Sequence, residues 1–335
     1  MRSARCTSAS GRAVRILRFV VAILMLGAPA GAKIHLRKAA RGFQMRMESF
    51  AVPPAGDLEG CEHLVTPNRK PMDVAAFQLN TTPGTHHFIV WDYLGQDQNP
   101  ADFWSGIEYS TACTGLGPQD GSFTTANLFG MLSGRSDFRF PPGVAVRLPA
   151  HANIYANLHY HNYTETSVNT DSVFNFIPAK RGTVQHHAQA FTVGTLQFSI
   201  PAKGSASVTG EWHAPVDLNL VSVTTHQHRR GTNILVHRID GGGADMGELV
   251  ESPSWEHPTI KWFPQAMRLS AGEGFRFTCS WQNPDDHEVN FGVTTEDEMC
   301  FVAGYFYPDD DNATVTGPGC LPQGAGLECF VPALN

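Results

Sequence analysis

The sequence predicts an all-β fold made of sandwiches or jelly rolls. Runs rich in β-branched and aromatic residues recur along the chain, separated by turn signals such as PPG at 141–143 and DGGG at 240–243. Glycine (32 residues) and proline (22) are frequent, and no long stretch has the apolar periodicity of a helix. The length of 335 residues suffices for two domains, and a hydrophobic content of 42% supports buried cores.

The expected strands alternate with turns over most of the chain. They occupy residues 85–93, 152–163, 171–178, 194–201, 218–228, 232–239, 274–281 and 300–308. Between them, the polar segment PAKRGTVQHHAQAF at 178–191 interrupts the strand pattern. We therefore expect two domains, at residues 33–185 and 186–335.

The N-terminus has the pattern of a signal peptide. Five arginines precede the apolar run FVVAILMLGA, and Ala30-Gly31-Ala32 resembles a cleavage site. The apolar run is short for a membrane span, and no later segment qualifies. We expect a signal peptide at 1–32 and an exported mature chain, secreted or periplasmic, that begins near Lys33 and has no transmembrane segment.

Charge and cysteine content bound the possible partners. Removal of the five leader arginines, which no acidic residue offsets, brings the formal charge from −7 to −12. A chain this acidic offers no surface for nucleic acid, and its charge weakly favours a cationic substrate, although solubility explains it equally well. Six cysteines remain outside the leader and predict three disulfides of open connectivity: Cys61, Cys113, Cys279, Cys300, Cys320 and Cys329.

The histidines cluster, and this predicts a metal site. The clusters are His86-His87, His159 with His161, His186-His187, and His226 with His228. Side chains two residues apart in a strand share one face, so His226 and His228 point the same way. Imidazole binds zinc, copper, iron or nickel, whereas a nearby thioether, here Met299, selects copper. A methionine is more often core filler, so Met299 alone is weak support.

Four blocks in order resemble the copper type II, ascorbate-dependent monooxygenases, which include peptidylglycine α-hydroxylating monooxygenase and dopamine β-monooxygenase. The blocks are THHFIVW, NLHYHN, THQHRRG and EDEMC, at residues 85–91, 157–162, 225–231 and 296–300. The resemblance implies two tandem antiparallel, jelly-roll-like β-sandwich domains that face each other across a cleft. It implies two copper ions per chain.

The resemblance also implies a role for each matched residue. His86, His87 and His159 would bind an electron-transfer copper, and His226, His228 and Met299 an oxygen-activating copper. Because His86 and His87 are adjacent, both reach one ion only if the strand bulges, twists or ends there. The family uses the first histidine of the 159/161 pair, so His161 is expected to be structural or to support a ligand, and His186 and His187 match no ligand. The implied disulfides are Cys61–Cys113, Cys279–Cys300 and, by elimination, Cys320–Cys329.

The implied activity is hydroxylation of a C–H bond of a small organic substrate with O₂ and ascorbate or a similar reductant. The peptide hydroxylase grips a substrate carboxylate at positions that here hold Thr224, Phe301 and Ala303. A peptide C-terminus is therefore an improbable substrate. Arg229, Arg230 or Tyr305 would have to serve a different one, and arginines in a loop are more often solvated.

Two other functions stay open. An exported copper-binding protein without enzymatic activity could use the same scaffold, although it has no need of two unlike sites. A zinc hydrolase would need a carboxylate base, and the nearest candidates, Glu296 and Glu298, adjoin Met299 rather than a histidine pair.

Overall fold

A computed structural model describes residues 33–93, 105–109, 113, 125–132, 134–309, 315, 319–323 and 326–334. Within these residues the chain forms 26 strands and no helix, which confirms the all-β class. Consequently, nothing in the described part of the chain could cross a membrane as a helix. The expected signal peptide, residues 1–32, lies outside the described residues.

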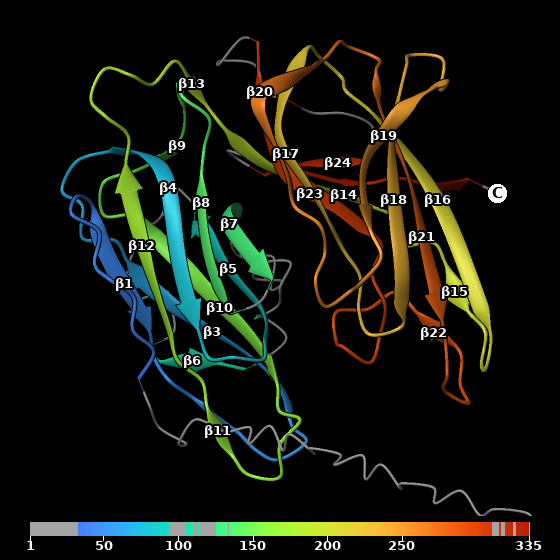
Figure 1. Cartoon of the computed structure of the whole chain (residues 1–335), viewed down its shortest axis with the longest axis horizontal. Helices are drawn as coiled ribbons and strands as arrows, with labels where there is room; N and C mark the ends of the chain where they lie inside the picture. Colours follow the sequence, from blue (N-terminus) through green and yellow to red (C-terminus); the bar gives the residue numbers. More distant parts are fainter. Residues whose placement is uncertain are drawn as a thin grey trace, which may run out of the picture. The chain divides into compact units, whose positions relative to one another are not determined.

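Strands up to His187 form two large sheets and a two-stranded ribbon, drawn in blue to green in Figure 1. The first sheet has the order β1 (Phe43–Met47), β12 (Ser172–Pro178), β4 (Met72–Thr81), β9 (Val144–Leu148) and β13 (His186–His187), with β8 (Arg135–Arg139) paired to β4. The second has the order β6 (Ile107–Glu108), β3 (Asp57–Val65), β10 (Asn153–His161), β5 (Thr85–Tyr93) and β7 (Thr125–Leu132). The ribbon pairs β2 (Ala51–Val52) with β11 (Val168–Asn169).

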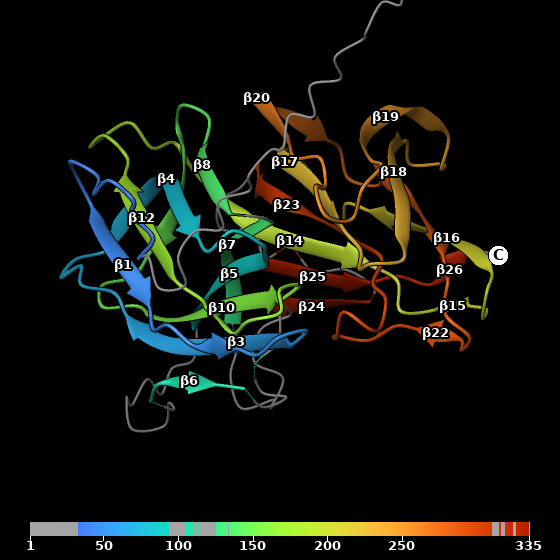
Figure 2. The same cartoon turned by 60° about the horizontal axis from the view of Figure 1, so that its bottom comes forward.

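Strands from Gln189 onward repeat this arrangement, and Figure 2 shows them from a second direction. One sheet has the order β20 (Lys261–Leu269), β17 (Leu218–His226), β23 (Phe301–Pro308), β14 (Gln189–Gly194), β25 (Gly326–Phe330) and β24 (Cys320–Gln323). The other has the order β19 (Asp245–Ser252), β18 (Gly231–Ile239), β21 (Gly274–Gln282), β16 (Ser205–His213) and β26 (Ala333–Leu334). A ribbon pairs β15 (Ser199–Ile200) with β22 (Val289–Asn290).

Burial along the strands follows from their place in the sheets. In β21 buried positions alternate with partly exposed ones, as expected for a strand with one face on the core. In β10, by contrast, eight consecutive residues are buried, and every second one (Ile154, Ala156, Leu158 and Tyr160) belongs to the core cluster of the first half. This central strand carries His159.

The two halves share part of one core. Val221 and Tyr305, from the second half, belong to the hydrophobic cluster of the first half. The Tyr305 ring centroid lies 5.0 Å from that of Phe140, and the Tyr305 hydroxyl donates a 2.8 Å hydrogen bond to the carbonyl oxygen of Leu128. The chain passes between the halves through Ala188 alone, because β13 ends at His187 and β14 begins at Gln189.

Two expectations about the strands were wrong in detail. The expected strand at 194–201 is interrupted, because the Thr195 hydroxyl accepts a hydrogen bond from the Gln197 backbone and forms a turn. The segment 178–191 was expected to lack strands, yet it contains β13 and the start of β14. The edge strands β19 and β20 were missed because their many exposed residues hide the alternation.

Candidate metal centre

The first imidazole group lies where β5 and β10 pair. His87 is opposite His159, whereas the next pair is Thr85 with Tyr160, so His86 is an extra residue in β5. This is a β-bulge, one of the three arrangements that would let two adjacent histidines reach one ion. One ring nitrogen from each of His86, His87 and His159 lies within 4.8 Å of the others, close enough for one metal ion.

Polar partners hold two of these rings by one nitrogen each. His87 Nε2 lies 2.8 Å from Asn157 Oδ1 and 3.2 Å from Glu59 Oε1. His159 Nε2 lies 2.5 Å from Asp57 Oδ1. In the described part of the chain, the Nδ1 atoms of both rings are buried and have no hydrogen-bond partner. Metal-binding histidines typically have this arrangement, with one nitrogen on the metal and the other on a carboxylate or carbonyl.

The carboxylates beside these rings are held ionised. Burial acts to raise the pKa of Glu59, but the hydrogen bond and charge of His87 outweigh it, so the pKa lies below its usual value. The pKa of Asp57 is lowered in the same way, with His159 outweighing burial. Both acids therefore accept hydrogen bonds from the imidazoles across the neutral pH range.

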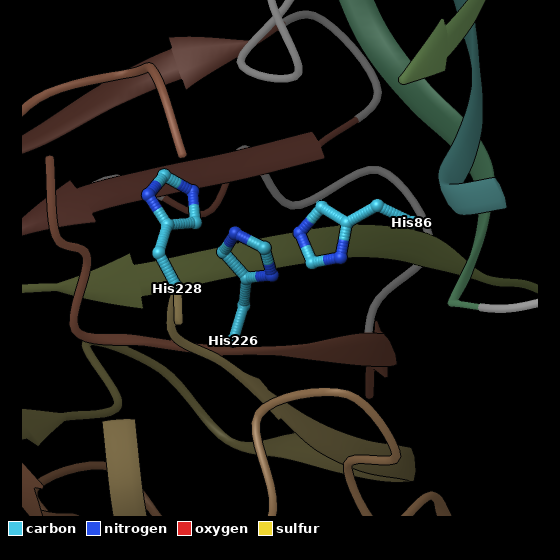
Figure 3. Close-up of side chains that lie close together, drawn as sticks. All are labelled: His86, His226 and His228. Carbon is cyan, nitrogen blue, oxygen red and sulfur yellow. The ribbon is translucent and has the colours of Figure 1, made fainter. Parts of the chain in front are cut away.

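The second imidazole pair stands at the end of β17. His226 is the last residue of the strand, and His228 follows in the turn. Their ring centroids are 5.1 Å apart, and His228 Nδ1 lies 3.2 Å from the carbonyl oxygen of Asp297, which leaves His228 Nε2 for a ligand. Figure 3 shows His86 approaching this pair from the other side, and nitrogens of all three rings lie within 4.8 Å of one another.

Glu298 fixes the turn that carries His228. It is completely buried, and its carboxylate accepts hydrogen bonds from the backbone N–H of His228 (3.0 Å) and of Arg230 (2.7 Å). The Trp281 indole N–H donates a third bond at 3.0 Å. These three bonds engage both carboxylate oxygens of Glu298, which a zinc hydrolase would need as a free base.

Three of the clustered imidazoles, those of His86, His226 and His228, are held neutral. Burial first, and then the neighbouring imidazoles, hold the pKa of His86 and of His226 well below the usual value. Burial lowers the pKa of His228 to about 4. Neutral imidazole is the form that binds a metal, so the site is ready for one at neutral pH.

Met299 lines a cavity of about 160 Å³ together with His226 and His228. Its side chain is buried, and its neighbour Cys300 is bonded to Cys279. The structure also contains the disulfides Cys61–Cys113 and Cys320–Cys329, so the three pairs are those that the resemblance implied.

The remaining singled-out histidines lie outside both imidazole groups. His161 Nδ1 is 3.8 Å from Asp57, the carboxylate that also binds His159, and its ring packs on Tyr163. His187 pairs with Asp73 at 3.0 Å, and His186 stacks on Tyr307 with centroids 4.3 Å apart.

The two arginines after His228 serve the surrounding turn. Arg229 donates to Asp285 (2.9 Å) and to Glu296 (2.7 Å). The Arg230 guanidinium is fully buried and donates to Asp285 and to the Glu296 carbonyl. Neither arginine lines the cavity.

Sequence reasoning missed the carboxylates that orient the rings. Asp57 and Glu59 lie two apart on β3 and face His161 and His159 in the register with β10. Their same-face spacing in GDLEGCE was the available signal. However, only the pairing of β3 with β10 shows that these carboxylates lie beside the histidines.

Residues 191–320 match the family model of the copper type II ascorbate-dependent monooxygenase, C-terminal domain. No curated protein matches the chain significantly. Among solved structures, the cowpea mosaic virus top component is 9% identical over 90% of this chain and 99% of its own, with a TM-score of 0.31. The ANX2 ectodomain from Arabidopsis thaliana is 7% identical over 86% of this chain and 92% of its own, with a TM-score of 0.22. Such low TM-scores carry no argument.

Proposed function

We propose that the chain is a member of the copper type II ascorbate-dependent monooxygenase family, whose C-terminal domain residues 191–320 match, and that it is an exported enzyme that hydroxylates a C–H bond of a small organic substrate. One atom of O₂ enters the C–H bond and the other leaves as water. Two molecules of ascorbate or a similar reductant supply two electrons, and two protons complete the water. The observation that carries the proposal is the cluster of five imidazoles, which form two groups of three that share His86. His226 and His228 of this cluster line a cavity together with Met299.

His86, His87 and His159 are proposed to hold an electron-transfer copper. The buried, unpartnered nitrogens His87 Nδ1, His159 Nδ1 and His86 Nε2 support this assignment. A buried polar atom without a partner costs free energy, and a bound metal would remove that cost. Glu59 and Asp57 would orient two of the rings and increase their basicity.

His226, His228 and Met299 are proposed to hold the oxygen-activating copper. The Asp297 carbonyl fixes the orientation of His228, and Glu298 fixes its backbone. Met299 would supply a soft, weak ligand that suits reduced copper. Copper at these two sites would supply the one-electron chemistry of the reaction.

The two halves are proposed to be the two sandwich domains of the family, at residues 33–185 and 186–335. The sheets divide at Ala188, which supports a boundary close to this one, although β13 (His186–His187) pairs with the first half. Three disulfides are consistent with an oxidising compartment, and hence with export to the periplasm or outside the cell.

Copper stoichiometry of residues 33–335 tests the proposal first. We expect two copper ions in the wild type and one in His159→Ala. The control is His187→Ala, which removes an imidazole that belongs to neither group and should leave two. One copper or none in the wild type, or zinc bound in preference, would contradict the two-copper assignment.

Oxygen consumption with ascorbate tests the catalytic role of Met299. Met299→Ala should abolish hydroxylation and keep copper on His86, His87 and His159. Full activity in this variant would exclude the assigned role. Two bound coppers without any turnover of ascorbate and O₂ would instead favour a copper-binding protein, and hydrolysis that persists without O₂ would favour a zinc hydrolase.

A further inference from the structure

The cavity beside Met299 is built from cross-strand pairs of β17 and β23. His226 is opposite Phe301, Thr224 is opposite Ala303, and Ser222 is opposite Tyr305, and all six residues line the cavity. Residues two apart share a face, so the three pairs form successive steps. A strand rises about 3.3 Å per residue, which places the Ser222 step about 13 Å from the His226 step.

One face of β5 lines the same cavity from the first half of the chain. His87, Ile89 and Trp91 occupy alternate positions of this strand and all contact the cavity. Phe138 and Trp262, whose stacked rings lie 5.2 Å apart, line it as well. The histidines and Met299 thus line one part of the cavity, and aromatic and aliphatic side chains line most of the rest.

No charged side chain of a described residue lines the cavity. The carboxylate-clamp positions of the peptide hydroxylase, here Thr224, Phe301 and Ala303, all line it and carry no charge. The acidity of the whole chain therefore does not extend to this cavity. Away from the three residues proposed to hold copper, an ion placed here would lose its hydration without gaining a partner of opposite charge.

Trp91 offers one unused hydrogen-bond donor. Its side chain is 94% buried (6% exposed), and its Nε1–H has no hydrogen-bond partner among the described residues. Buried tryptophan N–H groups normally find a partner, and because Trp91 lines the cavity, an acceptor on a bound molecule that reached Nε1 would satisfy this donor. A cavity of about 160 Å³ also has the right size, because an apolar cavity of about 150 Å³ holds one benzene ring.

From these observations we propose that the substrate is an uncharged molecule with a single apolar or aromatic ring and a hydrogen-bond-accepting oxygen that Trp91 recognises. The proposal rests on the proposed function, because it assigns this cavity to the substrate of the hydroxylation. It names Trp91 as a positioning residue for that oxygen.

Four ligands of matched shape test the charge preference: 2-phenylethyl methyl ether, butylbenzene, N-methyl-2-phenylethylammonium and 3-phenylpropanoate. Calorimetry on the copper-free and copper-loaded chain measures their binding. We expect the ether to bind best, and each ion to bind at least about tenfold more weakly. An ion that binds as tightly as the ether, or the absence of binding by all four, would overturn the proposal.

Two tryptophan variants test the donor. Trp91→Phe keeps an aromatic ring and removes the N–H, so the preference for the ether over butylbenzene should fall by about fivefold. The matched control is Trp262→Phe, which alters another tryptophan of the cavity and should leave this preference unchanged. An unchanged preference in Trp91→Phe would remove Trp91 from the recognition.

Thr224→Arg adds the missing cation to the cavity and should shift the preference towards 3-phenylpropanoate. A cooperative thermal unfolding transition shows whether this variant folds. If it does not fold, the comparison of Trp91→Phe with Trp262→Phe remains informative. Binding is measured separately from oxygen consumption. If the ether binds as expected and is not hydroxylated, the cavity assignment holds and the proposed function fails.

Discussion

The hydroxyl of Tyr305 donates a 2.8 Å hydrogen bond to the carbonyl oxygen of Leu128, and so joins strand β23 to strand β7 inside an aromatic contact. Tyr305 also lines the cavity, and its hydroxyl is completely engaged by this bond as a donor. The bond couples the wall of the cavity to the contact between the halves. Removal of the Tyr305 hydroxyl should therefore lower the stability of the folded chain.

Tyr305→Phe should lower the free energy of unfolding by about 1–2 kcal/mol, because it leaves the Leu128 carbonyl without this donor. Chemical denaturation of the copper-free chain measures the change. Tyr109→Phe, at a half-exposed ring, is the control and should change stability by less than about 0.5 kcal/mol. A Tyr305→Phe variant as stable as the control would show that the bond contributes nothing net.

Glu59→Gln should weaken copper binding by about tenfold or more, because an amide can orient the His87 ring but does not increase its basicity as a carboxylate does. Competition with a chelator of known affinity gives the change. The control is Glu62→Gln, because Glu62 lies on the opposite face of β3 from Glu59. This variant should bind copper as tightly as the wild type does. Equal affinity in both variants would contradict the role assigned to Glu59.

His86→Ala should weaken copper binding at the electron-transfer site alone, to which this residue is assigned, although its ring also lies close to those of His226 and His228. His226→Ala removes a ligand from the other site only and is the matched comparison. Copper titration monitored by a metal-sensitive spectrum should show one weakened site in each variant, and a different site in each. Two weakened sites in His86→Ala would contradict the assignment of this residue to one copper.

Asp92 should make stability depend on pH. Burial raises the pKa of Asp92 to about 7, and the hydrogen bond from the Tyr93 backbone offsets only part of this effect. The folded state therefore holds the proton more tightly than the unfolded chain does. The penalty on the ionised form is complete above pH 7 and disappears as the pH falls towards the unfolded value near 3.8.

Accordingly, Asp92→Asn should raise the free energy of unfolding at pH 8 by about 3 kcal/mol. This value is the free energy that corresponds to the pKa shift of Asp92, minus the cost of leaving the new amide unpaired. At pH 4, where the penalty on the ionised form is nearly absent, the variant should be less stable than the wild type by about 1 kcal/mol, the cost of the unpaired amide. Denaturation at the two pH values checks both statements. A difference that does not change with pH would mean that Asp92 is already ionised at little cost.

The sequence alone predicted the parts that depend on local periodicity. The same-face spacing of His226 and His228 is such a case, and so is the all-β class. The position of His86 depended on a bulge, which the two adjacent histidines suggested but could not locate. The sequence placed Glu298 beside Met299 rather than beside a histidine pair, and only tertiary packing brings Trp281 and the His228 backbone onto its carboxylate.

The single-residue passage at Ala188 has a mechanical consequence. Ala188 is buried, and its N–H donates to the Ala145 carbonyl at 2.8 Å, so rotation there would break a core hydrogen bond and expose aromatic rings. The amide of Ala188 should thus exchange its hydrogen as slowly as those of the central strands. A connection this stiff cannot work as a hinge. Molecules would enter the cavity through side-chain and loop movements at its rim, near the exposed Ile260, while the spacing between the imidazole groups stays constant.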